Sequence, residues 1–74
     1  MMKSITIYID ESLSTREIVK LKHELLAIPN VKDVEHPRHD LHDLTIDYEA
    51  HSDLPGLVLK KIRSKGFHPD IYSA

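Results

Sequence analysis

Six histidines are spread along this 74-residue chain, and their chemistry is the most distinctive in the sequence. Three of them, His36, His39 and His42, follow one another at intervals of three residues, with Asp40 and Asp43 interleaved. Imidazole nitrogens and carboxylate oxygens together are a ligand set that suits Zn²⁺, Ni²⁺ or Cu²⁺. The segment is therefore a candidate site for a divalent metal ion.

Two other interpretations of these histidines remain open. Histidines three residues apart do not share one face of a strand, so they can be ordinary solvated side chains. Several imidazoles also titrate between about pH 5 and pH 7, which would make this region a pH-responsive surface. Outside the cluster, His23 is expected on an exposed helix face, and His51 at the opposite end of the molecule.

Four short segments have the pattern of β-strands. Residues 4–10 and 44–49 alternate apolar and polar side chains, which is typical of strands buried on one face. Residues 31–36 and 67–72 are shorter apolar segments bounded by turn residues. This assignment places the histidine-rich segment in the turn between the second and third strands.

Two helices are expected between these strands. The first begins at a capping box, in which Ser14 bonds the backbone of Glu17 and Glu17 reaches back to the backbone of Ser14. Ser52 or Asp53 caps the second helix. Gly66 closes it, because glycine readily adopts the left-handed conformation that ends many helices.

The order β-α-β-β-α-β predicts an α+β fold, the ferredoxin-like sandwich. Right-handed crossovers place both helices on one face of a four-stranded antiparallel sheet. Residues 1–74 then form one domain with a thin core, because a chain of this length buries only about 60% of its unfolded surface. The expected core residues are Ile5, Ile7, Ile9, Ile18, Leu21, Leu25, Ile28, Val31, Val34, Leu44, Ile46, Val58, Ile62, Phe67 and Ile71.

Three connections meet at one end of such a sheet. They are the loop before the first helix, the turn between the second and third strands, and the loop before the last strand. That end would hold the candidate metal ligands Asp10, Glu11, His36, His39, His42 and His68. We therefore predict that any metal site of this chain lies at this end.

Three segments resemble the heavy-metal-associated (HMA) domains, the family of the small copper chaperones. Residues 28–34, I-P-N-V-K-D-V, resemble the family's L-P-G-V-x-x-V segment, and residues 44–48, L-T-I-D-Y, resemble its third strand. Residues 59–67, L-K-K-I-R-S-K-G-F, resemble its second helix, which ends in K-x-G-[YF]. The resemblance covers nearly the whole chain and implies the same fold and a role in metal trafficking or sensing.

The resemblance also implies where the family's metal site would fall. HMA domains bind copper(I) through M-x-C-x-x-C, and its three ligand positions correspond here to Ser12, Ser14 and Glu17. The chain contains no cysteine. Soft thiolates select copper(I), so we expect no copper(I) site, and Ser14 and Glu17 are better explained as a helix cap.

A second resemblance is to the cytoplasmic domains of cation-diffusion transporters. It rests on I-P-N-V-K-D-V at residues 28–34 and on D-L-H-D-L at residues 40–44. It fits less well, because a complete strand precedes the first helix in this chain.

Composition argues against several functions. The formal net charge of −2 disfavours nucleic-acid binding, and the open sheet face is expected to carry Asp47, Glu49 and Asp70, which repel phosphate. There is no glycine-rich phosphate loop and no nucleophile with a supporting pocket, so we expect no enzyme. Short apolar runs and the lack of a signal-peptide pattern predict a cytoplasmic protein that does not insert into a membrane.

A protein partner is the remaining expectation. A half-exposed sheet with free edges invites pairing, so we expect either a homodimer or another protein to bind through the open sheet face or an edge strand. The alternative to a metal-binding domain is therefore a metal-free protein-interaction or regulatory module of the same fold.

Overall fold

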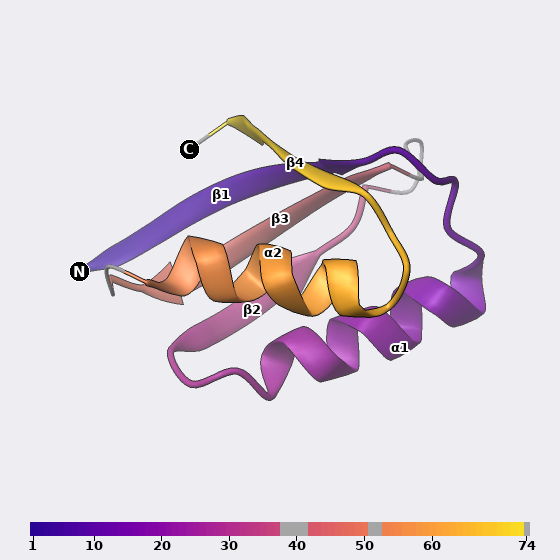
Figure 1. The fold of residues 1–74 in the computed structure, drawn as a ribbon. Helices are drawn as coiled ribbons and strands as arrows, with labels where there is room; N and C mark the ends of the chain where they lie inside the picture. The colour runs from indigo at the N-terminus through magenta and orange to yellow at the C-terminus, as the bar shows by residue number, and fades with distance from the viewer. Residues whose placement is uncertain (38–41, 51–52, 74) are drawn as a thin grey trace.

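The computed structural model describes residues 1–37, 42–50 and 53–73 of the chain, and Figure 1 shows its fold. The elements are β1 (Met2–Ile9), α1 (Thr15–Leu26), β2 (Val31–Glu35), β3 (Asp43–Glu49), α2 (Leu54–Ser64) and β4 (Pro69–Ser73). The predicted order of strands and helices is confirmed. The last strand begins at Pro69, two residues later than predicted, so Phe67 lies in the connection that precedes it.

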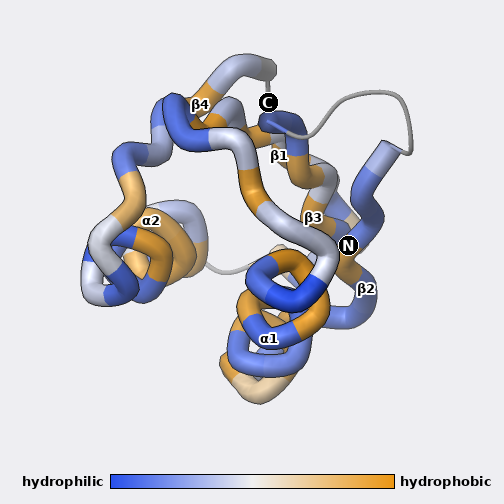
Figure 2. The backbone as a smooth tube through the Cα atoms, turned by 90° about the vertical axis from the view of Figure 1, so that its right-hand side faces the viewer, coloured by the Kyte–Doolittle hydropathy of each residue, from blue (hydrophilic) through white to orange (hydrophobic). Residues whose placement is uncertain are grey.

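The four strands form one antiparallel sheet in the order β2-β3-β1-β4. Strand β1 lies at its centre, and Ile7 is opposite Leu44 of β3 on one side and Ile71 of β4 on the other. Both helices cover the same face of the sheet, and Figure 2 shows apolar residues along the elements where the two layers meet. The ferredoxin-like architecture is therefore confirmed.

The capping box at the start of α1 is present as predicted. The Ser14 backbone N–H donates to the Glu17 carboxylate at 2.9 Å, and the Glu17 backbone N–H donates to Ser14 Oγ at 3.2 Å. Two backbone donors of the first turn, which have no partner inside the helix, are thereby satisfied.

In the part of the chain that the structure describes, two residues adopt the left-handed backbone region where the chain changes direction. Gly66 has φ of 89° directly after the end of α2, as the sequence predicts. Asn30 has φ of 77° between α1 and β2, at the position where the HMA segment L-P-G-V carries glycine. Asparagine tolerates this conformation better than most side chains, so the turn is kept without glycine.

The core lies between the sheet and the helices. Its buried residues are Ile5, Ile7, Ile9, Leu13, Leu21, Leu25, Val31, Val34, Leu44, Ile46, Tyr48, Leu54, Val58 and Ile62. Leu13, Tyr48 and Leu54 are additions to the predicted set, whereas Ile18, Ile28 and Phe67 of that set are only partly buried and pack against the core. Ile71 was predicted to be buried and is 41% exposed, because it lies on the edge strand β4.

Within the part of the chain that the structure describes, no helix is both long and apolar enough to span a bilayer.

We expect Leu25→Ala to destabilise the domain by about 2–5 kcal/mol, because Leu25 is fully buried and its truncation leaves a cavity. Leu26→Ala is the matched control: the neighbouring side chain is 40% exposed, so its loss should cost much less. Urea denaturation monitored by circular dichroism measures both. Equal losses of stability in the two variants would contradict this packing of α1.

Candidate functional site

Backbone hydrogen bonds tie three loops to the end of β1. The Ile9 N–H donates to the His42 carbonyl at 2.8 Å, on the side of β3. The Asp10 N–H donates to the His68 carbonyl at 3.1 Å, on the side of β4. These bonds confirm that the three connections predicted to meet at one end of the sheet do meet there.

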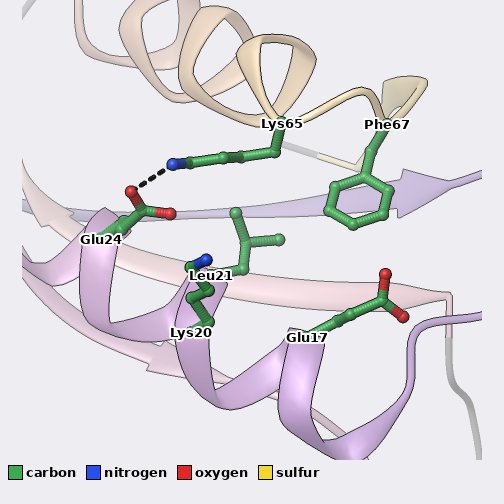
Figure 3. A pocket seen from close by; sticks show the side chains of 6 residues that line it. All are labelled: Glu17, Lys20, Leu21, Glu24, Lys65 and Phe67. Carbon is green, nitrogen blue, oxygen red and sulfur yellow. Dashed lines mark ion pairs between the residues drawn. The ribbon is translucent and has the colours of Figure 1, made fainter.

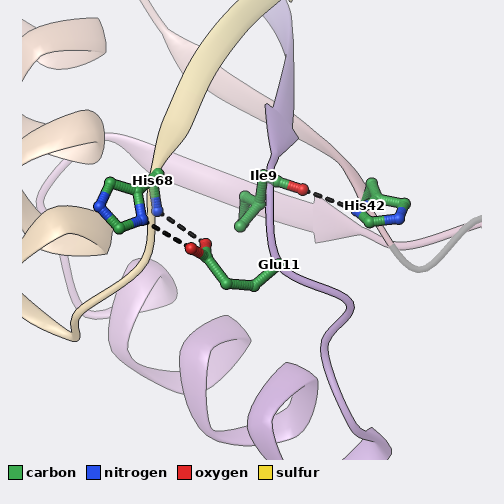
Figure 4. A network of polar contacts seen from close by, with 4 residues as sticks. All are labelled: Ile9, Glu11, His42 and His68. Atoms are coloured by element: carbon green, nitrogen blue, oxygen red, sulfur yellow. Dashed lines mark hydrogen bonds and ion pairs between the residues drawn. The ribbon is translucent and has the colours of Figure 1, made fainter.

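His42 is held in one orientation by contacts to β1 (Figure 4). Its Nδ1 lies 2.8 Å from the Ile9 carbonyl oxygen. A carbonyl can only accept, so Nδ1 carries the hydrogen and the neutral ring has its lone pair on Nε2. The ring also stacks on Tyr8, with centroids 5.0 Å apart, and Nε2 lies 3.4 Å from Ser12 Oγ.

Glu11 and His68 form a paired contact on the other side of β1 (Figure 4). One carboxylate oxygen of Glu11 accepts the His68 backbone N–H at 2.8 Å, and the other lies 2.6 Å from His68 Nδ1. The two hydrogen bonds from His68 lower the pKa of Glu11. The side-chain bond to Glu11, with its negative charge, raises the pKa of His68.

Both imidazoles are therefore oriented through Nδ1, and Nε2 is the nitrogen that can act as a ligand. In metal sites, a ligating histidine almost always donates its other N–H to a carbonyl or a carboxylate. His42 follows this pattern with the Ile9 carbonyl, and His68 follows it with Glu11. The two rings lie on opposite sides of the β1 end, because β3 and β4 flank β1.

The other predicted ligands are placed differently. His36 follows β2, which β3 separates from β1, and among the residues that the structure describes, buried His36 Nε2 has no hydrogen-bond partner. A hollow of about 520 Å³ beside it is lined by Lys22, Glu35, His36, Pro37 and Thr45. Asp10 is exposed, and His39 lies outside the described residues.

Among the described residues, one group of three possible metal ligands lies elsewhere. Oxygen atoms of Asp33, Glu35 and Asp47 all lie within 4.8 Å of one another. Asp33 is paired with Asp47 in the register of β2 and β3, so the strand pairing brings these carboxylates together. The sequence alone does not predict this group, because the pairing of β2 with β3 includes a register shift.

The start of α1, where HMA domains carry their cysteines, borders a small pocket of about 190 Å³ (Figure 3). Its lining includes Glu17, Leu21 and Phe67, and an ion pair between Lys65 and Glu24 closes one side. The hydrogen bond from Lys65 lowers the pKa of Glu24. Because Glu17 serves the helix cap and Glu24 pairs with Lys65, both carboxylates already have partners.

Solved structures of other proteins share this fold. The structure of the CsoZ metallochaperone superposes on this one with a TM-score of 0.79 at 21% sequence identity, covering 95% of this chain and 99% of CsoZ. The chain has an HMA-like fold. The oxidised MerP of Ralstonia metallidurans CH34 gives a TM-score of 0.79 at 8% identity, covering 99% of this chain and 100% of MerP.

A third structure is a copper-binding domain of the P-type ATPase HMA7, with a TM-score of 0.76 at 12% identity over 99% of this chain and 96% of that one. No protein-family model matches the sequence, and no curated protein matches it significantly. At these identities the HMA-like likeness is one of fold, and function must be argued from this chain's own residues.

We expect the His68 ring to titrate above its ordinary pKa of 6.5, and Glu11→Gln to bring the midpoint down, because the amide carries no charge. NMR titration of the imidazole resonances measures this. Asp10→Asn is the control: Asp10 raises the pKa of His68 less than Glu11 does, so its shift should be smaller. An unchanged midpoint in Glu11→Gln would contradict the pairing.

The Glu11–His68 pair stabilises the domain only within a range of pH. The contribution of Glu11 is present above its unfolded pKa and is lost as the pH falls through its lowered folded value. The contribution of His68 is present below its unfolded pKa and is lost as the pH rises through its raised folded value. Glu11→Gln should therefore reduce stability more at about pH 6 than at about pH 9.

Proposed function

We propose that this protein is a small metal-trafficking or metal-sensing domain that binds a divalent cation at the β1 end of the sheet. The observation that carries the proposal is the orientation of His42 and His68. Each ring has Nδ1 bonded to a fixed acceptor, the Ile9 carbonyl or the Glu11 carboxylate. Preorganised imidazoles with Nε2 as donor suit Zn²⁺, Ni²⁺ or Cu²⁺.

The candidate residues take different roles in this proposal. His42 is the anchoring ligand, and His39, three residues before it, is its expected companion from the same turn. Glu11 holds His68 on the opposite side of β1, so this oriented pair is separate from the His42 ligand. Asp10 and His36 belong to the loops of the same end and are secondary candidates.

Two facts support a role in metal handling without thiolates. The fold is the one found in a protein titled as a metallochaperone and in a domain titled as copper-binding. The chain has no cysteine, so its ligands for a metal must be nitrogen and oxygen donors of the harder, divalent-ion type. The domain would bind and transfer its cargo and would catalyse no reaction.

A metal-free protein-interaction or regulatory module is the second candidate. The exposed apolar side chains favour it, in particular Tyr8 of the open sheet face and Ile71 and Tyr72 of the edge strand. In that case the partner would be a second copy or another protein, bound through the sheet face or an edge, in the cytoplasm. Metal titration separates the two candidates.

We expect Zn²⁺ or Ni²⁺ to bind with a dissociation constant of about 1 µM, equivalent to about −8 kcal/mol, in calorimetric titrations. His39→Ala/His42→Ala should abolish binding, whereas Glu11→Gln should change it little, because His68 lies on the opposite side of β1 from His42. His23→Ala on the exposed face of α1 is the matched control and should bind normally. No heat and no change in melting temperature with excess metal would leave the interaction module as the function.

Copper(I) should not bind tightly when a competing chelator is present, because no thiolate is available to select it. A chromogenic copper(I) chelator as competitor gives the measurement. Retention of copper(I) by the protein would show that the chain replaces the HMA cysteines with other soft ligands.

A further inference from the structure

The charged side chains are divided between the two layers of the molecule. The acidic residues of the four strands are Asp33, Glu35, Asp43, Asp47, Glu49 and Asp70. Against them the strands carry Lys3 and Lys32. The basic residues of the two helices are Arg16, Lys20, Lys22, Lys60, Lys61 and Arg63. The sheet is therefore mainly acidic and the helical layer mainly basic, although the formal net charge is only −2.

The helical layer is positive because its basic side chains outnumber its two carboxylates. Glu17 accepts the backbone hydrogen bond of the α1 cap, and Glu24 forms an ion pair with Lys65 (Figure 3). Helix α2 has no acidic residue along its length. Lys60 and Arg63 are exposed on α2, so the outer surface of this layer is basic.

The open face of the sheet has the opposite character. Because Leu44 and Ile46 point into the core, the residues that alternate with them on β3, including Asp47, lie on the open face. Asp47 meets Asp33 and Glu35 of the neighbouring strand there. Tyr8 alternates with the buried Ile7 and Ile9, so it lies on the same open face, where it is 37% exposed.

The helical layer also offers an apolar groove. Ile28, Pro29 and Leu57 line a hollow of about 430 Å³ at the C-terminal end of α1, and Lys60 and Lys61 flank it. Leu57 is 46% exposed. An apolar groove beside ammonium groups fits an aromatic side chain that has carboxylates nearby.

The open sheet face presents that combination, since Tyr8 lies opposite Asp43 of β3 and Asp70 of β4 in the strand register. We propose that the open sheet face of one copy of this protein docks on the helical layer of a second copy, head to tail. Acidic groups around Asp47 then meet Lys60 and Lys61, which flank the groove at Leu57.

Charge decides between this arrangement and the symmetric ones. Two sheet faces brought together would oppose the Asp33, Glu35 and Asp47 groups of both copies, and two helical layers would oppose their lysines. Like charges brought together cost several kcal/mol, whereas opposite patches attract. A head-to-tail contact joins two different surfaces, so a pair of copies still has one free surface of each kind. Further copies can add to it, and the average size of the assembly rises with concentration. It does not involve the β1-end histidines and needs no metal.

Sedimentation velocity of the full chain in EDTA tests the proposal. The average mass should rise above the 8.5 kDa of one chain as the concentration increases towards about 1 mM. Raising the ionic strength from about 0.05 M to about 0.5 M should weaken association at least about tenfold, because salt screens exposed charges beyond a few ångströms. Circular dichroism of each variant confirms that it is folded.

Two charge reversals and their mixture locate the contact. Asp47→Lys alters the sheet face and Lys60→Glu the helical layer, and each alone should lose association. An equimolar mixture should recover it, because the altered face of one variant matches the altered layer of the other. Lys3→Glu is the control: it makes the same change in net charge as Lys60→Glu at the start of β1 and should associate as well as the wild type.

Each contrary outcome overturns the proposal. A monomer at every concentration, association that survives high salt or either reversal, or failure of the mixture to recover would exclude this contact. A monomer that binds a lysine-rich peptide through Asp47 would assign the sheet face to a basic partner protein in place of a second copy. If calorimetry showed no metal binding, the association test would be unaffected, because the sedimentation experiment is done in EDTA.

Discussion

The central position of β1 is the constraint on which the rest of this structure depends. Ile5, Ile7 and Ile9 are all buried on one side of a strand that bonds to β3 and to β4. Because β1 is fixed on both sides, the backbone that leaves it at Ile9 and Asp10 meets the loops that lead into both neighbours. The order of the strands therefore decides which loops and side chains meet at this end of the sheet.

The start of α1 shows how an HMA-like fold is kept without its thiolates. Helix α1 still needs its first backbone N–H groups satisfied, and the exchange of hydrogen bonds between Ser14 and Glu17 does so. Ser14 and Glu17 thereby serve stability. The imidazoles at the end of β1 are oriented by the carbonyl of Ile9 and the carboxylate of Glu11.

The two-layer architecture also organises charge. A strand that is buried on one face must place its polar residues on the other, and in this chain those residues are largely acidic. The helices expose lysines and arginines on their outer surface, and their two glutamates are already paired. A small domain with little net charge can therefore present two surfaces of opposite charge. These charges then determine which of its surfaces a charged partner binds.

The sequence by itself determined the order of elements, the capping box and the glycine that ends α2, because each depends on neighbours within a few residues. It also indicated which end of the sheet would collect Glu11, His42 and His68, since that follows from the order of the strands. Pairing across the sheet was needed to bring Asp33 to Asp47 and to orient His42 against Ile9.

Burial likewise depended on tertiary packing at particular positions. Leu13 lies in a loop without periodicity, yet the fold buries it, whereas Ile71 continues an apolar pattern and stays 41% exposed at the sheet edge. Local alternation indicates which side of a strand a residue faces, but only the neighbouring elements determine whether anything covers that side. The predicted ligands also depend on neighbouring elements. The sequence placed His42 and His68 at one end of the sheet, but only the tertiary structure shows that their rings lie on opposite sides of β1.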